Sequence, residues 1–266
     1  MEPTTTTVLA AANVPAEPVM RRFRMTIAYD GTAYNGWQRQ PEPALTVQRE
    51  IEKAAGSVVS HPVTVCGSSR TDQGVHALGQ VAVMQSTTYL EPEVLRRAIN
   101  SRLPADILIR TLDIAPTHFD VFMPVSKRYR FLIWNDRDRP VMNRQYVYHY
   151  YQPLDLAAMQ AACERFVGTF DYEAFRGRTD DRDNTVRTIF RCSVHRSRGN
   201  SPLVIFSVEG SGFLYHMVRT MVGTVLEIGR GHWKPERISD IIASKDRQQA
   251  GPTAPAQGLC LQWIRY

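Results

Sequence analysis

The sequence predicts an α+β fold of two similar subdomains, each an antiparallel β-sheet backed by helices. Alternating apolar strands occur in hairpin-like pairs, helices with one apolar face separate them, and the second half repeats the element order of the first. Of the 266 residues, 43 % are hydrophobic and 22 % are charged, which is typical of a folded domain and excludes a mainly disordered chain. No apolar run reaches the roughly 18 to 20 residues of a membrane span.

Strands and helices alternate in the first half. Phe23, Met25, Ile27 and Tyr29 share one face of a strand that the Asp-Gly turn after Tyr29 ends. The other segments are a helix over 46–59 capped by Thr46, a strand over 63–66, a strand through Val81 and Val83, a helix from Pro92 through Leu103 and a strand over 107–114.

The second half follows the same order. Strands are predicted over 129–134, 145–151, 187–195, 203–209 and 259–264. Asp155 is expected to cap one helix, a second runs over 213–228 until Gly229 and Gly231 end it, and Pro235 begins a third. The chain therefore divides into a flexible tail over 1–20, an N-terminal subdomain over 21–118 and a C-terminal subdomain over 119–266.

Charge and cysteine usage narrow the class of protein. The 32 basic residues exceed the 26 acidic ones by six, which favours an anionic partner such as nucleic acid. Because no two of the four cysteines lie within four residues, the sequence predicts neither a zinc ribbon nor a redox pair, but thiols in a reducing compartment. The N-terminus lacks the basic residues of a signal peptide, so we expect a cytoplasmic protein. The histidines have no partner at metal-ligand spacing, so we expect no metal site.

One polar loop stands out as a site for chemistry. Residues 66–77 read CGSSRTDQGVHA and lie between two apolar strands. Arg70 is close enough to Asp72 to hold its carboxylate ionised, and an ionised carboxylate in a partly dry site acts as a nucleophile or a base. The alternative is an ordinary turn with a surface ion pair, which the residue types fit equally well.

Five segments, in this order along the chain, resemble the tRNA pseudouridine synthase A family. They are YDGTAYNGWQRQ at 29–40, SRTDQGVHA at 69–77, KRYRF at 127–131, FLYHMVR at 213–219 and APAQGLCL at 254–261. Together the resemblance extends from about Arg24 to Tyr266.

The resemblance implies a cofactor-free enzyme that isomerises uridine to pseudouridine in the tRNA anticodon arm, at positions 38 to 40. It also implies a homodimer with tRNA lying across both subunits and a central basic cleft that holds the active site. By position, Asp72 is the nucleophile, which attacks C1′ of the ribose or C6 of the base. The target nucleotide must leave its stack, because its glycosidic bond is inaccessible there.

The other site residues follow from the same resemblance. Tyr129 stacks on the uracil and is a candidate base for its C5 proton, Arg219 is the buried partner of Asp72, and Arg70 fills the vacated stack or holds a phosphate. Leu259 and Phe131 line the nucleotide pocket, although Phe131 replaces a tyrosine of the family and is expected to serve as packing.

Expected RNA contacts are more scattered, and one departure concerns the catalytic loop itself. The residues that we expect to contact RNA are Arg70, His118, Phe119, Phe122, Arg176 and Arg178; Val121 replaces an arginine that many relatives carry. Ser69 stands where the family usually has glycine, so a positive φ at this position would strain the loop by about 1 kcal/mol.

Two other functions remain compatible with parts of the pattern. One is a non-catalytic tRNA- or RNA-binding protein on the same fold, against which the presence of Arg70, Asp72 and Tyr129 argues. The other is a hydrolase with an aspartate nucleophile, which needs a second carboxylate or a metal site near Asp72; the closest such pattern, Asp181 and Asp183, lies in an arginine-rich segment.

Overall fold

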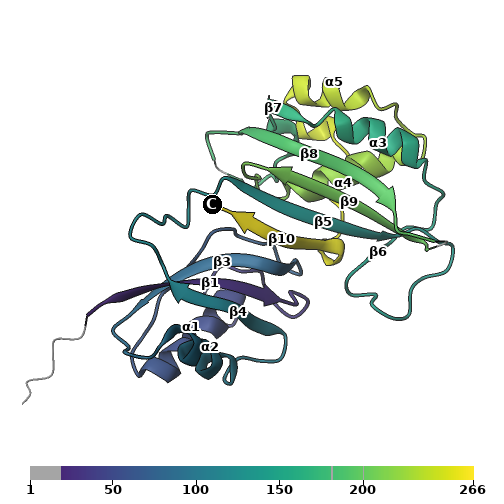
Figure 1. The fold of residues 1–266 in the computed structure, drawn as a ribbon. Helices are drawn as coiled ribbons and strands as arrows, with labels where there is room; N and C mark the ends of the chain where they lie inside the picture. Colours follow the sequence, from purple (N-terminus) through teal and green to yellow (C-terminus); the bar gives the residue numbers. More distant parts are fainter. Residues whose placement is uncertain (1–18, 181, 200) are drawn as a thin grey trace, which may run out of the picture.

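The computed structural model describes residues 19–180, 182–199 and 201–266 and has the predicted α+β class (Figure 1). Almost all of the predicted tail lies outside the described residues. Within the described residues, ten strands form one mixed sheet with helices packed against it.

Apart from β7, which was not predicted, the strands follow the predicted order. They are β1 (Arg21–Tyr29), β2 (Val65–Gly67), β3 (His76–Ser86), β4 (Ile107–Ile114), β5 (Ser126–Trp134), β6 (Tyr148–His149), β7 (Gly168–Asp171), β8 (Val186–Arg196), β9 (Leu203–Gly210) and β10 (Leu259–Arg265). The α-helices are α1 (Val47–Val59), α2 (Pro92–Asn100), α3 (Leu156–Glu164), α4 (Met217–Gly229) and α5 (Arg237–Ser244). Short 3₁₀ turns are η1 (Glu173–Phe175), η2 (Arg247–Gln249) and η3 (Ala256–Gly258).

The two halves share one sheet, in the order β4-β1-β3-β10-β5-β9-β8-β7. Strand β10, from the end of the chain, lies antiparallel to β5 and parallel to β3, where Cys260 is opposite His76 and Leu261 is opposite Ala77. Apolar periodicity identifies a strand but not its partners, so this joint between the halves was not predicted.

The helices cover one face of the sheet. Alternation on β1 buries Phe23, Met25 and Ile27 toward α1 and α2, which also contact each other. In the other half, α3 packs on β8 and against α4. Tyr29, Ala77, Leu261 and Tyr129 lie opposite one another along the strand pairs and are all buried, so the covered face continues across the joint.

Several predicted boundaries shift for local reasons. Asp155 caps α3 as predicted, because its carboxylate accepts hydrogen bonds from two backbone amides of the first turn. Thr46 does precede α1, but its hydroxyl makes no capping bond. The predicted helix over 213–228 begins only at Met217, because His216 has a left-handed backbone (φ 60°). Of the tyrosine-rich segment over 145–151, only Tyr148 and His149 form a strand.

Helix α4 and the segment before β10 pack at backbone distance. A Cβ atom at Gly223 would overlap the carbonyl oxygen of Pro252. On either side of this crossing, the amide of Gly251 donates to the hydroxyl of Thr224 at 3.0 Å and the amide of Ala254 donates to the carbonyl of Arg219 at 3.1 Å.

No helix within the described ranges is both long and apolar enough to span a bilayer.

Gly223→Ala is therefore expected to lower the free energy of unfolding by about 1 to 3 kcal/mol, because the added methyl group pushes the 251–254 segment away from α4. Urea unfolding followed by circular dichroism measures this. Gly212→Ala is the matched control, since its Cβ would meet only ordinary contacts with the Arg187 side chain. Equal stability of the two variants would contradict the backbone crossing.

Candidate active site

The loop over 67–75, between β2 and β3, is fixed by the loop that follows β1. The amide of Trp37 donates to the carbonyl of Thr71 at 3.1 Å, and the amide of Gly74 donates to the carbonyl of Tyr34 at 3.3 Å. Gly36 has a φ of +89° and lies so close to Thr71 that a Cβ atom would be 2.5 Å from its carbonyl oxygen. The buried indole of Trp37 thus anchors the loop, which explains why these two motifs occur together.

Ser69 adopts no strained backbone. The described residues with a positive φ other than glycine are Ser60, Asn143, His216 and Lys245, so the strain considered for a serine at position 69 is absent. The side-chain amide of Gln80 binds both the amide and the carbonyl of Ser69, at 3.2 and 2.5 Å. The Ser69 hydroxyl lies 3.0 Å from the phenolic oxygen of Tyr129, a contact that glycine cannot make.

Asp72 forms an ion pair with Arg219, from the opposite half of the chain. Nη1 of Arg219 donates to Oδ2 of Asp72 at 3.0 Å, and the two side chains are only 15 % and 14 % exposed. Nε of Arg219 donates to the carbonyl of Ala254 at 2.7 Å, which fixes the guanidinium in the plane that reaches Asp72. Because so little water reaches the pair, removing either partner would leave a poorly solvated charge.

His216 also contacts Asp72, although no spacing pattern in the sequence singled it out. Its Nε2 atom lies 3.6 Å from Oδ2 of Asp72, and its ring stacks on Tyr215 with centroids 3.8 Å apart. Burial lowers the pKa of His216. The charge of Asp72 opposes this shift, whereas the charges of Arg219 and Arg247 lower the pKa further. The imidazole is therefore neutral near pH 7, and a neutral imidazole beside the carboxylate is able to accept a proton.

Tyr129 lies under the same loop, on β5, and is 6 % exposed. Burial raises the pKa of its phenol well above the usual value; the Ser69 hydroxyl opposes the shift and the charge of Asp72 adds to it. The guanidinium of Arg219 is paired with Asp72 and is not a cause of any lowering of this pKa, so burial opposes the role of base that the resemblance implies for Tyr129.

The other candidates for the nucleotide pocket differ in exposure. Arg70 is exposed and makes no hydrogen bond or ion pair among the described residues, so it does not hold Asp72 as one reading of the sequence suggested. Leu259 is 4 % exposed and pairs in register with Phe131. Phe131 is fully buried against Gly258 and Tyr148, which is the packing role expected for it.

The residues expected to contact RNA on the connection between the halves divide in two groups. His118 is exposed and Phe122 is 66 % exposed, so both are accessible. Phe119 is buried, with its ring centroid 4.5 Å from that of Tyr266, and its carbonyl accepts a hydrogen bond from Arg22 at 2.5 Å. In this conformation Phe119 holds the connection in place.

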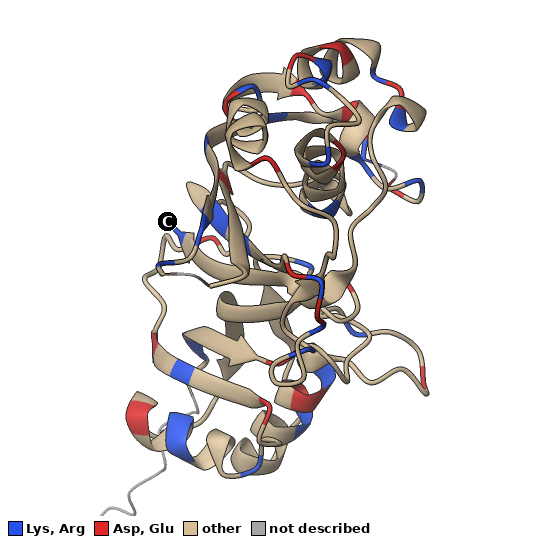
Figure 2. Cartoon of the chain, turned by 90° about the vertical axis from the view of Figure 1, so that its right-hand side faces the viewer, with Lys and Arg blue, Asp and Glu red and all other residues tan. Residues whose placement is uncertain are grey.

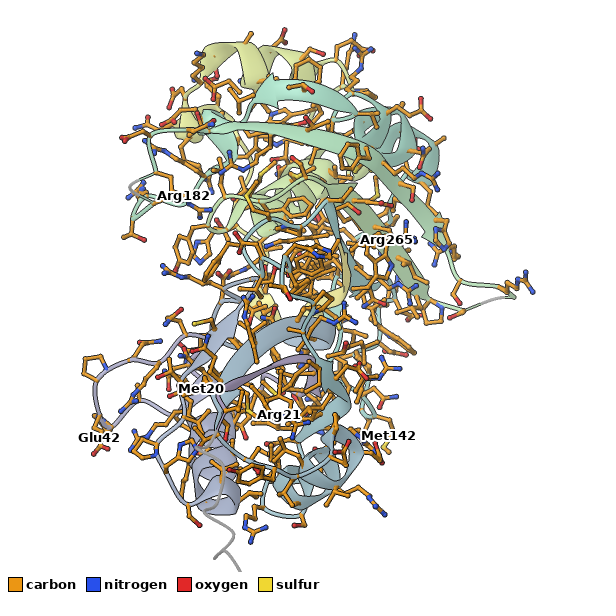
Figure 3. The ribbon with its side chains drawn as sticks, turned by 60° about the vertical axis from the view of Figure 1, so that its left-hand side comes forward. Met20, Arg21, Glu42, Met142, Arg182 and Arg265 are labelled. Atoms are coloured by element: carbon orange, nitrogen blue, oxygen red, sulfur yellow. The ribbon has the colours of Figure 1, made fainter. Side chains whose placement is uncertain are left out.

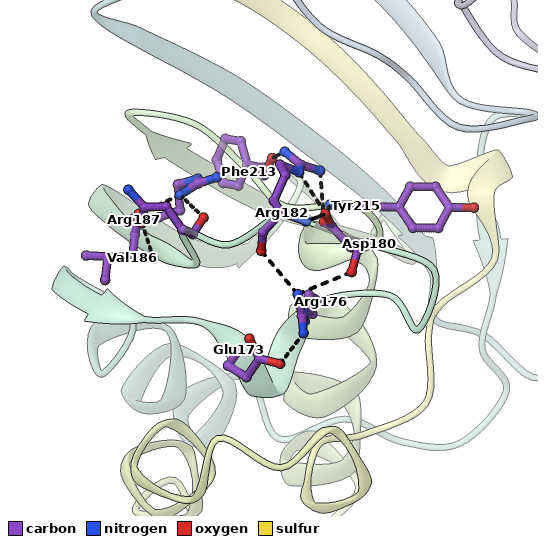
Figure 4. Close-up of polar contacts among 9 residues, drawn as sticks. Glu173, Arg176, Asp180, Arg182, Val186, Arg187, Phe213 and Tyr215 are labelled. Atoms are coloured by element: carbon purple, nitrogen blue, oxygen red, sulfur yellow. Dashed lines mark hydrogen bonds and ion pairs between the residues drawn. The ribbon is translucent and has the colours of Figure 1, made fainter.

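The described residues of the arginine-rich segment after η1 form several hydrogen bonds and ion pairs with one another (Figure 4). Arg176 binds the carboxylate of Glu173 at 2.7 Å and the carbonyls of Asp180 and Arg182, each at 3.2 Å. Arg178 is exposed. Burial is the main cause that lowers the pKa of Arg247, and the positive charge of Arg178 lowers it further. Arg178 is thus free to meet an anion, while Arg176 shapes the loop.

Across the described ranges, no three His, Cys, Asp or Glu side chains gather as metal ligands do. The arrangement instead places one nearly buried carboxylate, its guanidinium partner, a neutral imidazole and an aromatic ring around the same loop. Such a group can carry out nucleophilic chemistry on a flat, uncharged base.

Comparison with known proteins agrees with this chemistry. A family model described as tRNA pseudouridine synthase matches residues 25–123 and 162–266. Tyr29, Asp72 and Arg219 lie in these ranges, and Tyr129 lies between them. The fold and the site therefore define a member of the tRNA pseudouridine synthase family, and the chain belongs to it.

Individual relatives cover the same length. The chain is 40 % identical over 248 residues to a protein of Clostridium perfringens named tRNA pseudouridine synthase A 2, with 93 % of this chain and 100 % of the relative covered. It is 40 % identical over 248 residues, with the same coverage, to tRNA pseudouridine synthase A of Caldicellulosiruptor bescii. It is 41 % identical over 246 residues to the protein of that name from Moorella thermoacetica, with 92 % and 99 % covered.

The hydrogen bond between Ser69 and Tyr129 predicts energetic coupling. In a double-mutant cycle of Ser69→Ala and Tyr129→Phe, the unfolding free energies should deviate from additivity by about 0.5 to 1.5 kcal/mol, the net value of one buried hydrogen bond. Chemical denaturation of the four proteins measures it. Losses that add to within about 0.3 kcal/mol would show that the two hydroxyls do not interact.

Proposed function

We propose that this protein isomerises uridine to pseudouridine at positions 38 to 40 of the tRNA anticodon arm, with Asp72 as the nucleophile. The observation that carries the proposal is the Asp72 carboxylate of a family member, 14 % exposed and held by Arg219 at 3.0 Å. Arg219 fixes the carboxylate oxygen that it contacts, so the other oxygen is available to the substrate.

The reaction is an isomerisation that needs no cofactor. The bond from C1′ to N1 of the uracil breaks, a bond from C1′ to C5 forms, the proton leaves C5 and N1 gains one. Asp72 attacks the flipped nucleotide at C1′ or C6, and the uracil is released and turns in the site. The bond to Asp72 breaks again before the product leaves, which regenerates the free carboxylate. The low exposure of Asp72 and Tyr129 helps to exclude the water that would otherwise compete for C1′.

The surrounding side chains have separate roles in this proposal. Tyr129 stacks on the uracil as a neutral phenol, and burial, which raises its pKa, opposes its action as the base for the C5 proton. Leu259 packs beside the nucleotide, with Phe131 supporting it from within the core. Arg70, exposed and unpaired among the described residues, enters the space that the flipped nucleotide leaves.

The tRNA extends from this site over a basic surface. Lys and Arg occur on the strands near the joint between the halves as well as on the helices (Figure 2). Arg70, His118, Phe122 and Arg178 contact RNA directly in this proposal, whereas Phe119 and Arg176 position the segments that do so. The subdomains over 21–118 and 119–266 form the two walls of a central cleft around Asp72.

Substitution of Asp72 tests the function. On unmodified tRNA with uridine at positions 38, 39 and 40, the wild type should form pseudouridine, whereas Asp72→Asn and Asp72→Ala should form none, because neither variant keeps a nucleophilic carboxylate. Carbodiimide labelling with primer extension maps the product, and tRNA binding is measured in parallel.

Asp240→Asn, an exposed substitution of the same type on α5, is the matched control and should keep full activity. Binding by the wild type without product on a broad tRNA panel would favour a non-catalytic RNA-binding protein. Product from both Asp72 variants would show that another residue is the nucleophile.

We also infer that the protein works as a homodimer through the sheet face that lacks helices. That face contains a cavity of about 460 Å³ lined largely by apolar atoms, with Leu78 and Leu108 half exposed at its edge. The loop between β5 and β6 extends beside it and exposes Val141 and Met142 (Figures 1 and 3). An apolar surface of this kind is typical of a protein interface.

The four free thiols and the tRNA substrate fit a cytoplasmic location.

Leu78→Asp should convert the homodimer to a monomer, because it would bury a charge in the interface. Light scattering during size-exclusion chromatography gives the mass of wild type and variant. Leu45→Asp, 40 % exposed in the loop before α1, is the control that should remain dimeric. A monomeric wild type, or equal masses for Leu78→Asp and the wild type, would contradict this interface.

A further inference from the structure

Three cations gather beside the active site, and we name them the Lys127 cluster: Lys127 on β5, Arg182 in the loop before β8, and Arg187 on β8. Lys127 pairs in register with Gly210 of β9, and Gly210 pairs with Ile189 of β8. Arg187 is two residues before Ile189 and so points to the same side of the sheet. Figure 3 shows Arg182 on the loop that borders this side.

The cluster has more positive than negative charge. Asp180 binds Arg182 through both carboxylate oxygens, at 2.8 and 2.9 Å (Figure 4). By contrast, the Arg187 guanidinium donates only to the carbonyls of Asn184 and Val186, and Nζ of Lys127 donates to the carbonyl of Ser68 at 2.7 Å. Among the described residues, neither Lys127 nor Arg187 forms an ion pair with a carboxylate.

These like charges act on one another. Burial, followed by the charges of Arg182 and Arg187, lowers the pKa of Lys127 to about 8. Burial and then Arg182 lower the pKa of Arg187, against a smaller opposing effect of Asp180. The charge of Arg182 therefore destabilises the charged forms of both Lys127 and Arg187, and an anion bound between the three side chains would relieve that repulsion.

The position of the cluster connects it to the reaction. Lys127 is two residues before Tyr129 on the same face of β5, a separation of about 7 Å. Its partner Ser68 precedes Ser69, which contacts Tyr129. On the other side, the carbonyl of Phe213 accepts a hydrogen bond from Arg182 at 3.1 Å, and the ring of Phe213 meets that of Tyr129 edge to face.

We propose that Lys127, Arg182 and Arg187 bind one backbone phosphodiester of the tRNA next to the target uridine. The proposal rests on the proposed function, in which tRNA is the substrate. Arginine and lysine donors converging from separate elements suit a phosphodiester oxygen pair, and the low exposure of Lys127 strengthens the interaction relative to a surface contact. The phosphate would hold the backbone while the base leaves its stack.

A bound phosphate should also couple binding to a proton. The anion favours protonated Lys127 and raises its pKa in the complex, whereas in the free protein this pKa is about 8. Between these two values the protein takes up a proton as tRNA binds, so affinity falls as the pH rises above 8, by at most tenfold per pH unit.

The test compares Lys127→Met with Lys53→Met, an exposed lysine on α1, in the full-length protein. Dissociation constants for unmodified tRNA are measured in the Asp72→Asn background, so that no turnover occurs, at pH 7.5 and 9 and over a range of salt. Lys127→Met should bind about tenfold more weakly at pH 7.5, lose the pH dependence and reduce the salt slope by about one. Lys53→Met should behave like the parent.

A neutral methylphosphonate beside the target uridine separates this contact from a general charge effect. It should weaken binding by the parent protein and have a smaller effect on Lys127→Met, in which only the two arginines still contact this phosphate. Lys127→Arg should restore affinity and remain insensitive to pH, because arginine does not lose its proton in this range; it also keeps the test valid if Lys127→Met fails to fold.

Equal affinities of Lys127→Met and Lys53→Met at both pH values would overturn the phosphate site, as would a methylphosphonate effect of the same size in Lys127→Met and the parent. Pseudouridine formation by the wild type is measured on the same tRNA. Its absence would instead overturn the proposed function, so the two failures are distinguishable.

Discussion

The placement of β10 between β3 and β5 is the constraint on which the rest of the structure depends. It joins the two halves into one sheet and does so through only two parallel residue pairs with β3. Because the segment just before β10 also holds Arg219, through Ala254, the same feature sets the distance between α4 and the catalytic loop. A small error in this joint would separate Asp72 from Arg219.

The ion pair of Asp72 and Arg219 is the chemical consequence of that joint. Such a pair in a poorly hydrated site contributes little net stability, because desolvation offsets the attraction between the charges. Its value here is geometric: one carboxylate oxygen is held and the other is left for the substrate. The neighbouring contacts, from Gln80 to Ser69 and from Ser69 to Tyr129, fix the groups around it.

The cations beside the active site are also held by specific contacts. Cations that would repel one another in the free protein gather where an anionic backbone is expected, and carbonyl groups hold them there without neutralising them. In the same region, Glu173 and Asp180 pair with Arg176 and Arg182, which shape the loop. Arginines that pair with carboxylates therefore shape the loop, whereas Lys127 and Arg187, which contact only carbonyls, keep a charge that an anion can bind.

The sequence by itself determined the fold class, nearly all strands and helices, and the loop that contains Asp72, because apolar periodicity and motif spacing are local properties. Only the tertiary structure decided the single continuous sheet, the approach of His216 to Asp72, the hydroxyl contact made by Ser69 and the clustering of Lys127 with two arginines. It also showed that burial raises the pKa of Tyr129, which opposes a role as base. These features depend on which distant segments meet and on how much water they exclude, and neither is encoded in local sequence pattern.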